Sequence, residues 1–103
     1  MVMKKKTNQG DIIKIDNIKI PVLVVSKNYF NNSGEIIGCP IITDGEAGPL
    51  HIFVSGDKTK GYVHCEKMKL FDLKERGYSI TDRIHMDSII DITDAIQGIF
   101  DYI

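Results

Sequence analysis

Residues 10–26 read GDIIKIDNIKIPVLVVS, and this stretch predicts the fold. Two runs of aliphatic and β-branched residues, Asp11–Ile15 and Ile20–Ser26, each have the length of a β-strand. Asp16 and Asn17 stand between them, and both residue types tolerate the positive φ of a tight turn. The stretch therefore predicts an antiparallel β-hairpin.

Four further runs of strand length follow, each bounded by Gly, Pro, Asn or Asp. They are Glu35–Ile42, Leu50–Ser55, Gly61–Cys65 and Lys67–Phe71. Asp44–Pro49 holds two glycines, a proline and two acidic residues, so we expect a loop there. The Asn-Asn-Ser-Gly sequence of residues 31–34 and the Ser-Gly-Asp sequence of residues 55–57 predict turns.

The hydrophobic periodicity changes toward the C-terminus. Asp72–Gly77 predicts one helical turn that Asp72 caps and Gly77 ends. From Asp87 onward, isoleucines recur every three or four residues, as in an amphipathic helix. These isoleucines are Ile89, Ile92, Ile96, Ile99 and Ile103. Short strands closed by such a helix predict a mainly β fold with a C-terminal α-helix, built as a small, strongly bent barrel.

Length and composition exclude several classes of protein. The chain of 103 residues suits one domain, which we place at residues 10–103 after a flexible extension over residues 1–9. No apolar run approaches the roughly 20 residues that cross a bilayer. The polar, lysine-rich start predicts no secretory signal, and two cysteines are too few for a disulfide scaffold, so we expect a cytoplasmic protein.

The net charge of −1 is unevenly distributed along the chain. Residues 1–83 carry 13 basic and 10 acidic residues, whereas residues 84–103 carry four acidic residues and no lysine or arginine. The body of the domain could tolerate a polyanion, but it lacks the strong basic surface that proteins use to bind duplex DNA.

Three residues stand out as candidates for chemistry. His64 and Glu66 lie two residues apart on a predicted strand and so share one face, where a carboxylate can orient an imidazole for acid–base work. The commoner interpretation of this pattern is an exposed surface pair. Thr43 opens the glycine-rich loop, where a hydroxyl either binds an anionic substrate or caps the turn.

The sequence predicts neither a metal site nor a cofactor. His64 and Cys65 are neighbours on a strand, so their side chains point to opposite faces and cannot hold one ion. His51 and His85 could join one of them only through the fold. Residues 45–48 lack the spacing of a phosphate-binding glycine loop.

The order and spacing of these segments resemble the MazF/PemK toxins, the ribonuclease half of bacterial type II toxin–antitoxin pairs. The family's "GDI" opening, its "RPVLVVS" strand, its "P-x-T-T" turn and its "K-x-I-D-x-x-x-R-G" segment all have counterparts here. The similar segments are Gly10–Ile12, Pro21–Ser26, Pro40–Thr43, His51–Gly56, Gly61–Glu66 and Lys69–Gly77. The resemblance covers about residues 10–100.

The resemblance implies an SH3-like barrel that forms a homodimer and binds a cognate antitoxin protein. It also implies metal-independent cleavage of single-stranded RNA, in which the 2′-hydroxyl attacks the adjacent phosphate. Thr43 falls on the family's catalytic threonine and Glu66 on its strand acid, while His64 occupies a position that is arginine in the PemK-like branch. The residues we expect to bind RNA are Lys19, Ser26 and Lys67.

The chain departs from the family's pattern at three places. Ile20 stands where the family's catalytic arginine precedes the proline, Lys67 replaces a common glutamine, and the hairpin around Asp16–Lys19 is far shorter than the family's mobile loop. Loss of one such phosphate donor typically costs about 10²–10³ in rate.

Three hypotheses therefore stay open. The first is an endoribonuclease, and the second is a catalytically degenerate module that binds antitoxin or RNA without cleavage. The third is a gyrase poison of the CcdB type, which the absence of tryptophan from this chain disfavours.

Overall fold

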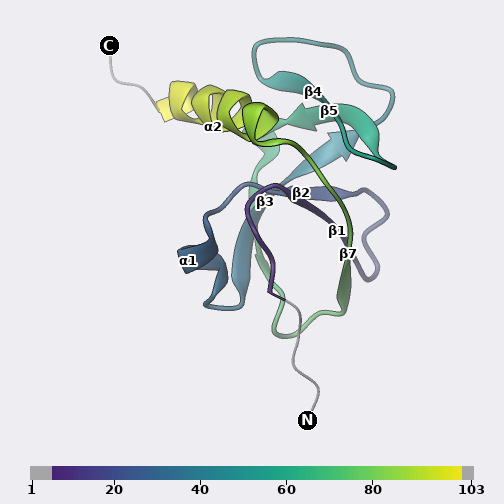
Figure 1. The fold of residues 1–103 in the computed structure, drawn as a ribbon, viewed down its shortest axis with the longest axis vertical. Coiled ribbons are helices and arrows are strands. Elements are labelled where there is room, and N and C mark those ends of the chain that lie inside the picture. Colours follow the sequence, from purple (N-terminus) through teal and green to yellow (C-terminus); the bar gives the residue numbers. More distant parts are fainter. Residues whose placement is uncertain (1–5, 101–103) are drawn as a thin grey trace.

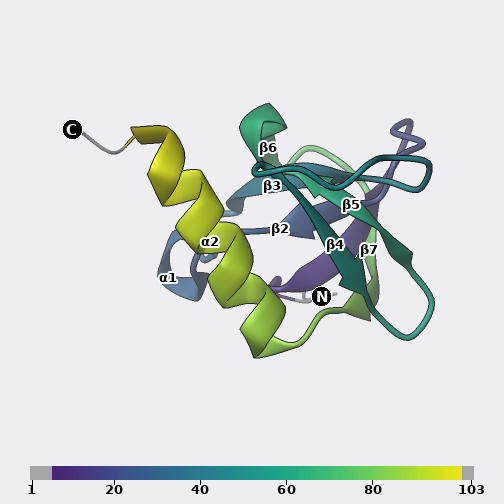
Figure 2. The same cartoon turned by 90° about the horizontal axis from the view of Figure 1, so that it is seen from above.

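A computed structural model describes residues 6–100 as a strongly curled antiparallel sheet with one long helix packed against it (Figures 1 and 2). The order of strands across the sheet is β4-β5-β3-β2-β1-β7, and β6 pairs with β3. The strands are β1 (Asp11–Ile15), β2 (Val22–Val24), β3 (Glu35–Ile42), β4 (His51–Ser55), β5 (Lys60–His64), β6 (Lys69–Asp72) and β7 (Tyr78–Arg83). The helices are α1 (Asn28–Asn31), the 3₁₀ turn η1 (Cys65–Lys67) and α2 (Met86–Phe100). This half-barrel with a C-terminal helix confirms the predicted fold class.

The long strand β3 divides the sheet into two parts. Its first half, Glu35–Gly38, pairs with β6, and its last two residues, Ile41 and Ile42, pair with β5. Its other edge pairs with β2, and a Cβ atom at Gly38 would collide there with Val22. The β4–β5 hairpin therefore projects from one end of β3 and lies apart from α1 (Figure 1).

Aliphatic side chains fill both faces of the curled sheet, and each buried one contributes roughly 1.5–3 kcal/mol. One cluster lies under α2 and includes Ile12, Leu23, Cys39, Val63, Ile89 and Ile92. The second lies on the other face and consists of Ile13, Ile15, Val22, Val24, Ile36 and Leu73. None of the helices in residues 6–100 is long and apolar enough to span a membrane.

The first hairpin forms as predicted. The bounds of β1 match the predicted strand, Asn17 has a φ of 68°, and Ile12 pairs with Leu23. The second strand is shorter than predicted, since only Val22–Val24 joins the ladder. Ile20 therefore lies in the connection before β2, with 41% of its surface exposed.

The predicted helical turn over residues 72–77 is wrong. The Asp72 carboxylate accepts a hydrogen bond of 2.9 Å from the Lys74 backbone N–H, which closes a turn instead of capping a helix. The chain then enters β7, a strand that the sequence did not predict and that pairs with β1. The sequence also did not predict the helical turn α1. It ends at Asn31, where the predicted turn over residues 31–34 begins.

Other predicted strands have slightly different bounds: Leu50–Ser55 corresponds to β4 (His51–Ser55), and Lys67–Phe71 corresponds to β6 (Lys69–Asp72). The strand predicted over Gly61–Cys65 ends at His64, because η1 begins at Cys65. Contacts with the domain begin before Gly10, since Thr7 is buried and the Gln9 side chain donates to the Val25 carbonyl. Ile103 lies outside the described residues.

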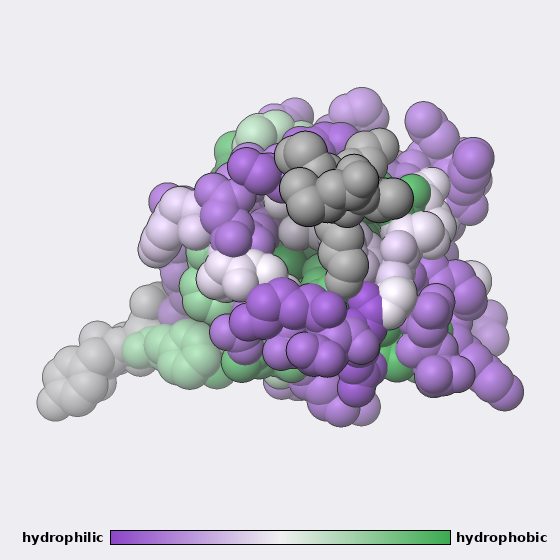
Figure 3. All heavy atoms as spheres, turned by 90° about the horizontal axis from the view of Figure 1, so that it is seen from below, coloured by the Kyte–Doolittle hydropathy of each residue, from purple (hydrophilic) through white to green (hydrophobic). Residues whose placement is uncertain are grey.

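The C-terminal helix is two-sided, as its periodicity predicts. Ile89 and Ile92 are buried against the sheet, whereas Ile90 and Phe100 are 49% and 70% exposed. Figure 3 shows a mostly hydrophilic face of the molecule, with hydrophobic side chains gathered beside the end of α2.

Candidate functional site

The β4–β5 hairpin positions the candidate site on its outer face. Alternation along a strand turns Val54 and Val63 into the core and leaves their neighbours on the other side. His51 pairs with His64 across the two strands, and Phe53 pairs with Tyr62. The outer face of this hairpin therefore carries two histidines side by side and an adjacent pair of aromatic rings.

The two histidines stack on each other, and one of them binds a carboxylate. Their ring centroids lie 3.8 Å apart with an interplanar angle of 7°. His51 Nε2 lies 2.8 Å from Glu66 Oε2, a hydrogen-bond distance. Glu66, His51 and His64 thus form a continuous chain of contacts, with His51 in the middle.

This arrangement corrects the predicted geometry of His64 and Glu66. We expected the two residues to share one strand face, but β5 ends at His64 and Glu66 belongs to η1. The 3₁₀ turn carries the carboxylate to His51, the residue that the sequence did not assign to the site. The hairpin register provides the missing link, because it places residue 51 opposite residue 64.

The electrostatics of the three residues follow from these contacts. The hydrogen bond with His51 lowers the pKa of Glu66 and keeps the carboxylate ionised. Burial lowers the pKa of His64, and the neighbouring His51 adds to this effect. Both ring nitrogens of His64 are buried and have no hydrogen-bond partner within residues 6–100. His64 therefore favours the neutral form, which disfavours it as a source of positive charge.

Thr43 follows the end of β3 and lies beside the part of β5 that is farther from His64. It is exposed in the turn after β3, and the β3–β5 register continued by one residue would set it opposite Gly61. That position is three residues along β5 from His64, which corresponds to about 10 Å. By this register, Thr43 lies toward the end of β5 that is farther from His64.

Lys19 and Ile20 approach the same end of β3 from β2. The Ile41 backbone N–H donates to the Pro21 carbonyl at 3.0 Å, so the β2–β3 register runs on toward Ile20 and Ile42. Continued by one further residue, this register sets Lys19 opposite Thr43. Both Lys19 and Ile20 are exposed.

The two remaining RNA-binding candidates have different surroundings. The Ser26 hydroxyl accepts a hydrogen bond from the Ile37 backbone N–H at 2.9 Å and donates to the Asn31 side chain at 2.5 Å. These bonds tie α1 to β3, so this hydroxyl already has structural partners. Lys67 is exposed in η1, next in sequence to Glu66.

The two cysteines lie in the core behind the site. Burial raises the pKa of Cys39 to about 12, and Cys65 and Glu66 add to this effect. Burial also raises the pKa of Cys65 to about 11, and Glu66 adds to it. Because the thiolate is the reactive form, burial makes both thiols poor nucleophiles.

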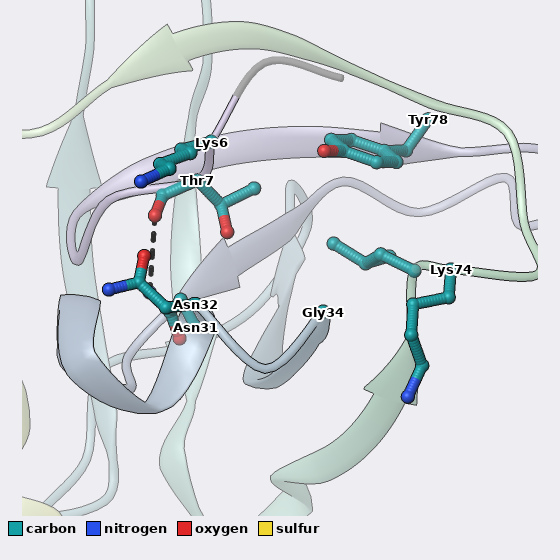
Figure 4. Close-up of a pocket in the computed structure, with 8 residues that line it drawn as sticks. Lys6, Thr7, Asn31, Asn32, Gly34, Lys74 and Tyr78 are labelled. Atoms are coloured by element: carbon teal, nitrogen blue, oxygen red, sulfur yellow. Dashed lines mark hydrogen bonds between the residues drawn. The ribbon is translucent and has the colours of Figure 1, made fainter. Parts of the chain in front are cut away.

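A small cavity of about 140 Å³ lies near α1, far from the β4–β5 hairpin (Figures 1 and 4). Thr7, Asn31 and Tyr78 contribute to its lining. Figure 4 shows the ammonium groups of Lys6 and Lys74 pointing away from the space between these residues. The cavity therefore lacks the converging charges of an anion site, and the histidine pair remains the better candidate.

Comparisons with known proteins bear on the family and the fold of this chain. Residues 8–100 match the family of the PemK-like, MazF-like toxin of type II toxin–antitoxin systems. A comparison with curated proteins gave no significant match.

Among solved structures, a MazE–MazF complex from Deinococcus radiodurans matches with a TM-score of 0.84 and 16% identity, over 94% of this chain and 98% of that one. An endoribonuclease from a mycobacterial species matches with a TM-score of 0.80 and 18% identity, over 93% and 92%. A mycobacterial endoribonuclease in complex with its cognate antitoxin gives 0.78 and 17%, over 91% and 94%. These likenesses establish a shared fold.

Proposed function

Because this chain belongs to the PemK-like, MazF-like toxin family of type II toxin–antitoxin systems, we propose that it is an endoribonuclease that cuts single-stranded RNA without a metal. The observation that carries the proposal is the 2.8 Å contact between His51 and Glu66 on the outer face of β4 and β5. The proposed site keeps the predicted Thr43, His64 and Glu66 and adds His51.

The His51–Glu66 pair can move the proton that the reaction must remove. When His51 Nε2 carries its proton toward Glu66, Nδ1 is left as an acceptor for the proton of the 2′-hydroxyl. The 2′-oxygen then forms a bond to phosphorus, and the bond to the 5′-oxygen breaks. The products are a 2′,3′-cyclic phosphate and a 5′-hydroxyl, and water can supply the proton to the leaving oxygen.

The other residues have supporting roles in this proposal. The His64 ring stacks on His51 and holds it in the orientation that Glu66 requires, so His64 is a positioning residue. The Thr43 hydroxyl and the Lys19 ammonium group would donate to an oxygen of a neighbouring phosphate in the RNA chain, beyond the end of β3. Lys67 adds a positive charge beside Glu66, and Ser26 remains a predicted RNA contact.

We propose an antitoxin as the protein partner. The solved structures of similar fold include complexes of toxin with antitoxin. The antitoxin would lay an acidic segment over the basic side chains that otherwise meet RNA, so added salt should weaken the complex. We also retain the cytoplasm as the proposed location.

A second candidate function is binding without cleavage, and Ile20 favours it. An exposed isoleucine stands where the resemblance places a catalytic arginine, and isoleucine cannot donate hydrogen bonds to a phosphate. Under this alternative the fold would bind antitoxin or RNA, and the His51–Glu66 pair would be a surface contact.

One cleavage assay separates the two functions. A mixed-sequence single-stranded RNA is incubated, with a chelator present, with wild type, Thr43→Ala, His64→Ala and Ile20→Arg. We expect slow cutting by wild type that leaves cyclic phosphate ends, weaker cutting by the Thr43 and His64 variants, and faster cutting by Ile20→Arg. His85→Ala, which changes an exposed histidine outside the cluster, serves as the control. RNA that is bound but not cut by wild type or by Ile20→Arg would establish the binding module instead.

A further inference from the structure

We propose that His51, His64 and Glu66 form a binding site for a transition-metal dication of the Zn²⁺ class. The three residues come from β4, β5 and η1, and one ligand atom of each lies within 4.8 Å of the others. Two imidazoles and one carboxylate are a donor set that zinc accepts, with the fourth position left to water.

The unpartnered nitrogens of His64 give an independent indication of a ligand. Both are buried and make no hydrogen bond within the described part of the chain. A buried polar atom without a partner is costly, and coordination of an ion would satisfy one of these nitrogens. The chain at Gly45 lies close to this ring, because a Cβ atom added at Gly45 would lie 3.4 Å from His64 Nε2.

Coordination requires side-chain movements, including rotation of one histidine ring. Zinc bonds to nitrogen and oxygen are about 2.0–2.2 Å long, so tetrahedral ligand atoms lie about 3.3 Å apart. An imidazole holds a metal near the plane of its ring, and two parallel rings 3.8 Å apart cannot both do so. One ring must therefore rotate out of the stack. The His51 and Glu66 side chains are 32% and 37% exposed, which leaves both of them room to adjust.

The surroundings restrict which ion can bind. Mg²⁺ prefers an octahedral set of oxygen ligands, whereas this cluster offers two nitrogens, so Mg²⁺ should not compete. Cys65 is adjacent in sequence but its thiol lies in the core, directed at the Val63 carbonyl at 3.8 Å. The ligand set is thus limited to the two histidines and the glutamate.

Metal occupancy has a consequence for RNA chemistry that rests on the proposed function. An ion on Glu66 and His51 would replace their hydrogen bond and occupy the groups that move the proton. Zn²⁺ would then inhibit a nuclease that needs no metal for its reaction. The binding itself does not depend on any catalytic activity.

The test is a Zn²⁺ titration of the full chain without RNA, after treatment with a chelator and dialysis, followed by competition with a chromophoric chelator. We expect one Zn²⁺ per chain and no binding of Mg²⁺. His51→Gln, His64→Gln and Glu66→Gln should each weaken binding by more than about tenfold, since loss of even an indirect partner of a metal costs about 10- to 100-fold.

Two control variants match the test variants in chemistry. His85→Gln and Glu75→Gln remove an exposed histidine and an exposed acid outside the cluster, so both should bind Zn²⁺ like wild type. Glu66→Gln changes an exposed side chain and should keep the fold, which circular dichroism checks. Absence of Zn²⁺ binding by wild type, undiminished binding by a folded Glu66→Gln, or equal weakening by the controls would overturn the proposal. A wild type that binds Zn²⁺ but never cuts RNA would overturn only the proposed function.

Discussion

A single carboxylate, that of Asp82, fixes the turn that brings His51 opposite His64. It accepts hydrogen bonds from the backbone N–H groups of Asp57, Lys58 and Thr59 at 3.1, 2.7 and 2.8 Å. These groups form the turn between β4 and β5, so Asp82 ties the hairpin to β7. Gly56 allows this close approach, since a Cβ atom there would lie 2.5 Å from the carboxylate.

The pKa of Asp82 makes this turn sensitive to acid. Partial burial acts to raise the pKa, but the backbone donors outweigh it and lower the pKa from 3.8 to about 2. Because the pKa is lower in the folded state, the ionised Asp82 carboxylate stabilises the fold above pH 4–5. This contribution is lost as the pH falls through about 4 toward 2. We expect Asp82→Asn to lower the free energy of unfolding by about 1–3 kcal/mol at pH 7.

Urea unfolding of wild type and Asp82→Asn at pH 7 and near pH 2 measures this effect. The difference between the two proteins should shrink at the lower pH, where about half of the Asp82 side chains are protonated. Asp57→Asn, which changes an exposed acid in the same turn, should show little effect at either pH. An equal loss of stability at both pH values would contradict the account.

The two buried thiols should be unreactive in the folded protein. Their pKa values of about 12 and 11 leave almost no thiolate at pH 8, and the core shields both sulfurs. We expect native protein to react with a thiol reagent far more slowly than protein unfolded in guanidinium. In the unfolded protein, two thiols per chain should react. Fast labelling of the native protein would show that the β5 end of the core opens readily.

At the scale of elements, the pairing of β3 with β5 depends on Gly61. A Cβ atom there would lie 2.8 Å from the Ile42 carbonyl oxygen and 2.8 Å from an Ile41 methyl group. Gly61→Ala should therefore destabilise the protein by about 1–3 kcal/mol through overpacking. The control is Gly48→Ala, since a Cβ atom at Gly48 meets nothing within 4 Å. Thermal unfolding of both variants tests this, and equal midpoints would contradict it.

The spacing of hydrophobic residues along the sequence predicted several elements correctly. The bounds of β1 and β3 match, and α2 begins at Met86, one residue before the predicted Asp87. Asp72 and Gly77 resemble the ends of a helical turn, and the sequence predicted no strand after Gly77. The alternating exposure along β7 arises from its pairing with β1, a contact between segments about 65 residues apart.

The site was predicted only in part, because its geometry also depends on contacts between segments far apart in the sequence. His64 and Glu66 could be chosen by spacing, but the direction of Glu66 depends on where β5 ends, which η1 decides. His51 could have been found from the turn at residues 56–59, because pairing Ser55 with Lys60 sets residue 51 opposite residue 64. The contact between His51 and Glu66 arises only in the assembled fold.

At the scale of the whole molecule, the outer face of α2 suggests a second copy of the chain. Met86, Ile90 and Phe100 are 60%, 49% and 70% exposed, so α2 leaves several large apolar side chains on the surface. We predict a homodimer at micromolar concentration, which sedimentation can measure. Ile90→Asp should weaken it while Asp91→Asn, a change to the neighbouring exposed acid, should not. A monomeric wild type would contradict this prediction.

The most direct test of the central claim is a double-mutant cycle on RNA cleavage by His51 and Glu66. Initial rates are measured for wild type, His51→Ala, Glu66→Gln and the double variant, with a chelator present. If the two residues act as one proton-transferring pair, each single variant loses about 10²–10⁴ in rate and the double variant is little slower than His51→Ala. Losses that multiply in the double variant, or cleavage by His51→Ala at the wild-type rate, would contradict the account.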